Sequence, residues 1–214
     1  MKIGILGSGT VGQTLGVGFL NYGFQVMLGT RDPQKPEVQS WVQANPGATA
    51  GTFEQTAQFG EFIVLATAGH AALDAISLAG TPNLGGKTVM DATNPIAGPP
   101  AGGILPFFTG PNDSLAERIQ AAVPQAHVVK AFNSVGAARM VNPTYRQGTP
   151  TMFYCGDDAR AKQQVADVIR QFGWQPYDCG GIVAARAIEP LCILWCSRGF
   201  QHNQWDHAFA LLTA

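Results

Sequence analysis

The sequence predicts an α/β protein: a Rossmann-type, doubly wound parallel sheet extended by two further strands and a small C-terminal helical part. Two observations support this fold class. Short apolar runs alternate with helical segments along most of the chain, as expected for strand–helix–strand units of a parallel sheet. A G-x-G-x-x-G turn over residues 7–12 follows the first apolar run and opens the first helical segment, the context in which this motif is informative.

The N-terminal segment supplies the strand, turn and helix of this pattern. Lys2–Leu6 is an apolar run, and Thr10–Tyr22 carries apolar residues three and four apart, which predicts a helix. Gly7 allows a tight turn, Gly9 lets a pyrophosphate approach backbone N–H groups, and Gly12 lets the helix pack closely on the strand. We therefore expect a dinucleotide to bind along the turn, which consists of Gly7, Ser8, Gly9, Thr10, Val11 and Gly12.

The end of the second predicted strand, Phe24–Leu28, bears on the kind of dinucleotide. An NAD site carries an acidic residue about here, roughly twenty residues after the turn, to hold the ribose hydroxyls. This chain has Thr30 and Arg31 instead, with Lys35 one helical turn later. Because a guanidinium suits a phosphate, we predict NADP. NAD remains the alternative, because the acidic residue Asp32 directly follows Arg31. Asp32 also precedes a proline and can simply begin the next helix.

Composition and charge narrow the class of protein. The formal net charge is −1 and no basic run occurs, so nucleic acid is not expected as a partner. No apolar run approaches the ~20 residues that cross a bilayer, so no membrane span is expected. The four cysteines form no C-x-x-C pair. Buried thiols, no metal site and a reduced, cytoplasmic protein are therefore expected.

The remaining residues continue the strand–helix alternation and divide into two predicted domains, a dinucleotide-binding domain over residues 1–150 and a C-terminal extension over residues 151–214. The further predicted strands are Ala48–Ala50, Phe62–Ala66, Lys87–Asp91, Ala126–Phe132, Thr151–Cys155 and Trp174–Tyr177. The further predicted helices are Pro33–Ala44, a short one from Thr52 to Gly60, one from His70 to Ala79, Ser114–Val123, Asp157–Phe172, Ile182–Arg198 with a break or kink at Pro190, and Asp206–Thr213. A turn over Pro82–Gly86 and a long loop over Ala97–Asn112 complete the pattern.

Four predicted strands end in small or amide-bearing residues, in segments 7–12, 67–70, 94–96 and 133–136. In a doubly wound sheet, ligands bind beyond the carboxyl ends of the strands. We therefore expect these segments to line one cofactor cleft. His70 is the best candidate there for proton transfer. Lys130 also ends a strand, and a structural role is favoured for it over that of a general acid.

Six segments in this order resemble the NADPH-dependent oxidoreductases related to coenzyme F420 reductase. They are KIGILGSGTVG, LGTRDP, DATNPI, VKAFNSVGAARM, FYCGDD and EPLCILW, and they extend over nearly the whole chain. The oxidoreductase domain of the six-transmembrane ferric reductases looks similar, without the membrane part of those proteins. The loop Ala97–Asn112 has no counterpart that we can place in the F420 reductase, so the resemblance predicts NADPH and leaves the acceptor open.

The resemblance also implies a role for each group of candidate site residues. NADPH would lie over the glycine turn, with its 2′-phosphate held by Thr30, Arg31 and Lys35. Its pyrophosphate and nicotinamide would pass Thr67, Ala68 and His70. The nicotinamide would be flanked by Asn94, Pro95, Asn133 and Ser134. The C-terminal extension, around Leu191–Trp195, would cover the acceptor pocket.

Direct hydride transfer between NADPH and a second redox partner, such as coenzyme F420 or a flavin, is the expected activity. For hydride transfer between two redox cofactors, the protein has to supply only their alignment and the exclusion of water. No catalytic residue is therefore assigned. Two alternatives remain open: a dehydrogenase of a small carbonyl or imine substrate that uses His70 or Lys130 as acid, and a non-catalytic NADPH sensor. Arg186 and Glu189 are expected to form a surface pair. A homodimer is expected from the apolar late helix and the aromatic loop.

Overall fold

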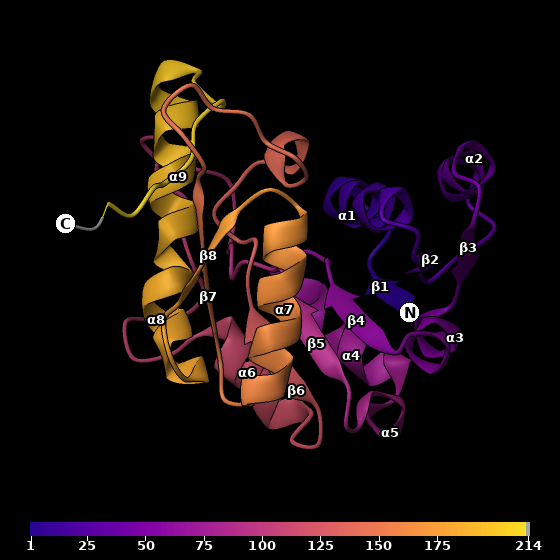
Figure 1. The fold of residues 1–214 in the computed structure, drawn as a ribbon. Coiled ribbons are helices and arrows are strands. Elements are labelled where there is room, and N and C mark those ends of the chain that lie inside the picture. Colours follow the sequence, from indigo (N-terminus) through magenta and orange to yellow (C-terminus); the bar gives the residue numbers. More distant parts are fainter. Residues whose placement is uncertain (213–214) are drawn as a thin grey trace.

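The computed structural model describes residues 1–212, which form an eight-stranded sheet flanked by helices (Figure 1). The strands are β1 (Lys2–Leu6), β2 (Gln25–Gly29), β3 (Ala48–Gly51), β4 (Phe62–Leu65), β5 (Thr88–Asp91), β6 (His127–Lys130), β7 (Thr151–Gly156) and β8 (Gln175–Asp178). Their order in the sheet is β3-β2-β1-β4-β5-β6-β7-β8. The helices are α1 (Thr10–Asn21), α2 (Pro36–Ala44), α3 (Phe53–Phe59), α4 (Ala72–Ala79), α5 (Thr81–Leu84), α6 (Leu115–Ala122), α7 (Ala159–Gln171), α8 (Ala185–Ile188) and α9 (Pro190–His202), with 3-10 turns η1 (Gly69–Ala71), η2 (Ala137–Arg139) and η3 (Ile182–Ala184).

The predicted Rossmann-type α/β fold is confirmed, and the two added strands run against the others. Strands β1 to β6 are parallel to their neighbours, whereas β7 pairs with β6 antiparallel and β8 pairs with β7 in parallel. A parallel connection needs a long crossover, usually a helix. The segment between β6 and β7 contains only η2. Strand β7 therefore begins at the end of the sheet where β6 finishes, and it runs in the opposite direction.

Both faces of the sheet are buried, which explains why its central strands are continuous apolar runs. On β4, Phe62 and Val64 face one side and Ile63 and Leu65 the other. The first side is covered by α1 and α7, and the second by α3, α4 and α6. Phe172, at the end of α7, packs on Phe19 of α1 with ring centroids 5.0 Å apart. The two sides of the predicted boundary at residue 150 therefore share one sheet and one core, and the division itself stays a prediction.

The last predicted helix, Asp206–Thr213, is wrong. Residues 206–212 are not helical, and Thr213 lies outside the described residues. The Thr151 N–H donates to the Phe209 carbonyl at 2.8 Å, and the Leu211 N–H donates to the Thr151 hydroxyl at 2.9 Å. Short helices are marginal in water, and the backbone groups of this segment bond to distant partners instead.

Smaller differences have local causes. The helix predicted from Pro33 begins at Pro36, because Asp32 forms a turn in which its carboxylate accepts the Gln34 N–H at 3.0 Å. The turn predicted at Pro82 is the short helix α5. The break predicted at Pro190 is confirmed, since α9 begins there, where a proline fits the first turn.

A buried ionic cluster joins the sheet to the C-terminal helices. The Lys130 ammonium donates to the Asp91 carboxylate at 2.9 Å and the Thr93 carbonyl at 2.5 Å, and lies 3.3 Å from the Glu189 carboxylate. Glu189 also accepts the Leu115 N–H at 3.0 Å at the start of α6. Burial alone would lower the pKa of Lys130, but the two carboxylates outweigh it and hold that pKa above its ordinary value.

The prediction of a surface pair between Arg186 and Glu189 is wrong, because Glu189 belongs to this buried cluster. Glu189 is almost completely buried with Lys130, and Arg186 binds Glu117 on α6 at 2.8 Å. Both residues thus tie the C-terminal helices to α6, and the structural role favoured for Lys130 agrees with its complete burial.

Replacing the lysine of this cluster should destabilise the protein strongly. Lys130→Met leaves two buried carboxylates without their cation, a class of change that costs about 3–5 kcal/mol. The matched control, Arg170→Met, removes an exposed partner of Asp167 and should change stability by about 0–1 kcal/mol. Urea denaturation followed by circular dichroism measures both. Similar small losses in the two variants would contradict the role given to the cluster.

Candidate functional site

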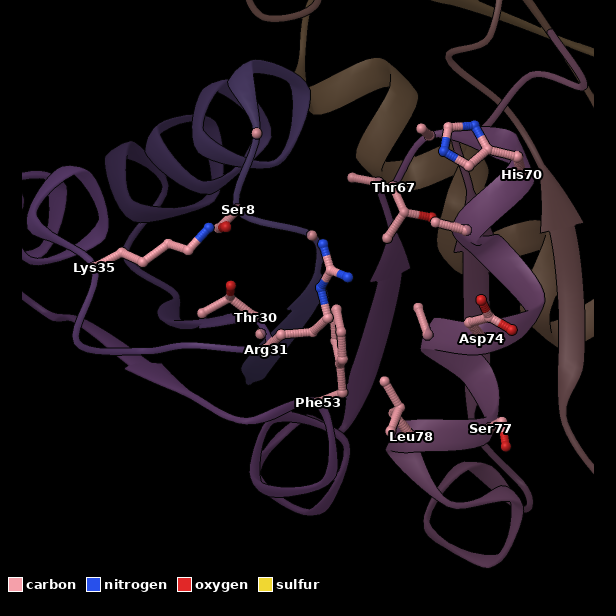
Figure 2. A pocket seen from close by; sticks show the side chains of 17 residues that line it. Ser8, Thr30, Arg31, Lys35, Phe53, Thr67, His70, Asp74, Ser77 and Leu78 are labelled. Atoms are coloured by element: carbon pink, nitrogen blue, oxygen red, sulfur yellow. The ribbon is translucent and has the colours of Figure 1, made fainter. Parts of the chain in front are cut away.

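A pocket of about 600 Å³ opens at the carboxyl ends of β1, β2 and β4 (Figure 2). Its walls come from the turn after β1, the segment between β2 and α2, the start of α3, and the segment from β4 through α4. Nine of the expected site residues line it: Gly7, Ser8, Gly9, Thr30, Arg31, Lys35, Thr67, Ala68 and His70. The sheet thus brings together segments that are more than sixty residues apart in the chain.

A second pocket, of about 430 Å³, continues the first toward β5. The two pockets share Thr67, Ala68 and His70. Two further expected site residues, Val11 and Asn94, line the second pocket. One long cleft therefore follows the carboxyl edge of the sheet from β2 to β5. This is the topological position at which doubly wound sheets bind ligands.

The three motif glycines have different surroundings. Gly7 has φ +131°, and a Cβ there would lie 2.4 Å from the Ala66 carbonyl oxygen. A Cβ on Gly12 would lie 2.1 Å from the Gly7 carbonyl oxygen, so only glycine lets α1 approach the turn so closely. A Cβ on Gly9 would meet no atom within 4 Å. Since Gly9 lines the pocket and needs no special packing, its missing side chain leaves room for a ligand instead.

The start of α1 is suited to an anion. Gly9 is its N-cap, and no side chain caps the helix. The first N–H groups of a helix lack partners within the helix and carry the positive end of its dipole. Here they follow a turn that lines the pocket, which is the arrangement that binds a pyrophosphate.

The end of β2 presents two cations. Arg31 and Lys35 are exposed, line the pocket, and form no ion pair with any residue of the described chain. Figure 2 shows both side chains extending into the pocket, with the buried Thr30 between them. The Asp32 carboxylate accepts a hydrogen bond within its own turn and does not line the pocket. At the end of β2, the charged side chains that line the pocket are thus the two cations and not the carboxylate of Asp32.

The β5 and β6 ends are joined by a pair of amides. The Asn94 side chain donates to the Asn133 carbonyl at 2.8 Å, and the Asn133 side chain donates to the Ile188 carbonyl at 3.0 Å. The Asn133 Oδ1 and Thr67 Oγ1 atoms are buried and have no hydrogen-bond partner in the described chain. A buried acceptor or hydroxyl of this kind favours a bound polar ligand or water nearby.

Five of the expected site residues line neither pocket: Thr10, Gly12, Pro95, Asn133 and Ser134. Conversely, Phe53, Asp74, Ser77 and Leu78 line the larger pocket and were not expected. The sequence carried a weak signal for part of this set, because Asp74 and Leu78 are four apart on the helix that follows a strand end. Their common wall becomes apparent only once α3 and α4 are placed.

The long loop over residues 97–112 is an ordered hairpin. Ile96 pairs with Phe107 and Ala101 with Ile104, and the two glycines at the tip both have positive φ, as in a type I′ turn. The base of the hairpin lines the second pocket through residues 96–98. A Cβ on Gly103 would meet the Gln201 side chain of α9 at 2.7 Å, so the tip reaches α9.

The segment expected to cover the acceptor pocket contributes to a neighbouring cavity. Pro190 and Ile193 line a space of about 240 Å³ together with Phe107 of the hairpin. Trp195 packs on Gly136, where a Cβ would lie 2.8 Å from the indole ring. Lys130 lines none of these spaces and is paired with two carboxylates, which removes it as a free general acid.

Neither a metal centre nor a membrane-spanning helix is found in residues 1–212. No group of three or more His, Cys, Asp and Glu side chains in this range is placed to hold a metal ion. None of its helices has both the length and the apolar character that a bilayer crossing requires.

Similar known proteins include NADP reductases and metalloreductases. The sequence profile of the family described as NADP oxidoreductase, coenzyme F420-dependent, matches residues 2–95. A solved structure from Arthrobacter sp. fb24, described as a candidate F420-dependent NADP reductase, is 33% identical with a TM-score of 0.92, and the match covers 100% of both chains. The F420-dependent NADP reductase of Methanocaldococcus jannaschii is 28% identical over 89% of each chain.

A second group of relatives is longer. Metalloreductase STEAP3 of Rattus norvegicus is 31% identical over 89% of this chain, but the match covers 36% of that protein. The chain thus spans about a third of the length of the metalloreductases that it matches. The full-length match to the Arthrobacter protein and the profile match over the glycine turn show that the chain belongs to the family of coenzyme F420-dependent NADP oxidoreductases.

Proposed function

We propose that this protein binds NADP(H) along the cleft and transfers a hydride between NADPH and a small redox acceptor such as coenzyme F420 or a flavin. The observation that carries the proposal is the pairing of two features in one pocket. An uncapped helix start behind a glycine turn shares this pocket with two cations that form no ion pair within residues 1–212. A dinucleotide with an additional phosphate matches this arrangement.

Each part of NADPH has a matching part of the cleft. The N–H groups at the start of α1 would hold the pyrophosphate, and Gly9 leaves the space that its approach requires. Arg31 and Lys35 would hold the 2′-phosphate, with the Thr30 hydroxyl between them. Thr67 and His70 lie where the two pockets meet, between the phosphate end and the nicotinamide end.

The choice of NADP over NAD rests on the charges at the end of β2. A carboxylate in this place would accept hydrogen bonds from ribose hydroxyls and repel a phosphate. The Asp32 carboxylate is occupied in its own turn, and the pocket receives Arg31 and Lys35 instead. These cations favour the phosphorylated cofactor.

The β5 side of the cleft is where we place the redox chemistry. NADPH bound there supplies a hydride from its nicotinamide ring. Val11, Ala68 and Ile96 give this pocket apolar walls, which exclude water. The amide of Asn94 offers hydrogen bonds that orient a planar ring. Alignment and dehydration are what a protein adds to hydride transfer between two redox cofactors.

One observation favours the carbonyl or imine reductase as a second candidate. His70 is the one ionisable side chain among the residues that line the second pocket, and it lies at the junction of both. It could protonate a substrate that receives a hydride from the same side. The effect of a His70 substitution on turnover therefore distinguishes a flavin-like acceptor from a carbonyl substrate.

The glycine turn offers a matched pair of variants. Gly9→Ala adds a methyl group in open space beside the pyrophosphate site, so the protein should fold normally and bind NADPH at least about tenfold more weakly. Gly12→Ala drives a methyl group against the Gly7 carbonyl and should lower the free energy of unfolding by about 1–3 kcal/mol.

Fluorescence titration with NADPH and urea denaturation measure these two effects. Unchanged NADPH affinity in a stable Gly9→Ala protein would contradict binding over the turn.

The 2′-phosphate site is tested with Arg31→Ala. Loss of the charge-assisted contact to the 2′-phosphate should weaken NADPH binding by about tenfold or more, and should weaken binding of NADH, which lacks that phosphate, by clearly less. Arg170→Ala, a change on an exposed face of α7, should alter neither affinity. Equal affinities of wild type and Arg31→Ala for NADPH and NADH would show that Arg31 does not select the cofactor.

The acceptor is tested by supplying NADPH with coenzyme F420, riboflavin, a ferric chelate, and small carbonyls and imines. Turnover of F420 or flavin that persists in His70→Ala is the expected result. Turnover confined to a carbonyl or imine and abolished in His70→Ala would support the second candidate. Tight NADPH binding without turnover of any acceptor would leave a cofactor sensor. Absence of NADPH binding would remove the proposed function altogether.

The homodimer and the cytoplasmic location stay predictions. Several apolar side chains of α9 and the following segment are exposed, among them Leu194 and Phe200. Light scattering at micromolar concentration tests the dimer, and a monodisperse monomer would exclude it.

A further inference from the structure

The larger pocket extends past the two cations, away from the turn after β1. This far end is formed by Phe53 at the start of α3 and by Asp74, Ser77 and Leu78 on α4. Pyrophosphate and 2′-phosphate sites account for the turn and for Arg31, and they leave this end unassigned. The part of the dinucleotide attached to the phosphorylated ribose is the adenine base, so the base is the group that reaches it.

The shape of this end suits a flat ring. Figure 2 shows Arg31 beside Phe53 on one side of the pocket, with Asp74 and Leu78 on the α4 side opposite. Within the described residues no ion pair joins Arg31 and Asp74, so the space between them stays open. A guanidinium plane stacks on aromatic rings, and apolar side chains complete the slot.

Asp74 is the group that can distinguish one base from another. It is exposed, lines the pocket, and makes no hydrogen bond or ion pair to another side chain in residues 1–212. A carboxylate only accepts hydrogen bonds. Adenine presents its 6-amino group as a donor, whereas hypoxanthine presents at the same position a 6-oxo acceptor that a carboxylate would repel.

We propose that Asp74 selects the adenine base of the cofactor by accepting a hydrogen bond from its 6-amino group, with the ring held between Arg31 and the α4 wall. This inference rests on the proposed function, because it requires NADPH in the cleft. Asp74 also lies in the first turn of α4, where a negative charge interacts favourably with the helix dipole. That structural role would not discriminate between bases.

The test compares NADPH with reduced nicotinamide hypoxanthine dinucleotide phosphate, in which a 6-oxo group replaces the 6-amino group of the base and N1 carries a proton. Fluorescence titration should show wild type binding NADPH about fivefold or more tightly. Asp74→Asn should bring the ratio of the two affinities to about one or reverse it, since an amide can donate to the 6-oxo group. Asp74→Ala should also remove the preference, without reversing it.

Asp167→Asn, on the exposed face of α7, is the matched control and should keep the wild-type ratio. An equal affinity of wild type for the two dinucleotides, or an unchanged ratio in a folded Asp74→Asn protein, would overturn the assignment. Failure of wild type to bind NADPH at all is a different outcome, which rejects the proposed function itself.

Discussion

The contact between the first turn of α1 and the carbonyl group of Gly7 determines the geometry of the whole cleft. A methyl group on Gly12 would lie 2.1 Å from that oxygen, so the helix can approach the strand this closely only because Gly12 lacks a side chain. The approach directs the start of α1 at the carboxyl edge of the sheet. Position along that edge then decides which group of a dinucleotide each neighbouring strand end can meet.

The cleft has two ends with different chemistry. Toward β2 the pocket carries two cations and one carboxylate, all exposed and free to meet a charged or polar ligand. Toward β5 it has mostly small and apolar walls, backed by the Asn94–Asn133 amide pair. Behind that pair, the Lys130 cluster ties β5, β6, α6 and the start of α9 together. Rigid support of this kind would keep two planar rings aligned, as the proposed hydride transfer requires.

Much of the fold could be predicted because its signals are local. A buried parallel strand such as Phe62–Leu65 is a continuous apolar run whatever lies next to it. The capping box that opens α3 needs only Thr52 and Gln55, and both of its hydrogen bonds are present. The glycine turn was informative for the same reason, since each of its constraints comes from the adjoining strand and helix.

What could not be predicted depends on partners far away in the sequence. The segment after Asp206 carries apolar residues that suit a helix, yet Thr151 and α9 take up its backbone groups. Helical spacing pairs Arg186 with Glu189, but the buried Lys130 competes for the carboxylate. Asp74 and Phe53 come from separate helices, and their common pocket exists only after the chain has folded.

The hairpin between β5 and α6 separates two tasks that many enzymes combine in the same residues. Its base borders the β5 side of the cleft and its tip meets α9, whereas the glycine turn and both cations lie on other segments. Under the proposed function, a longer, shorter or different hairpin would therefore present the same bound NADPH to acceptors of quite different size.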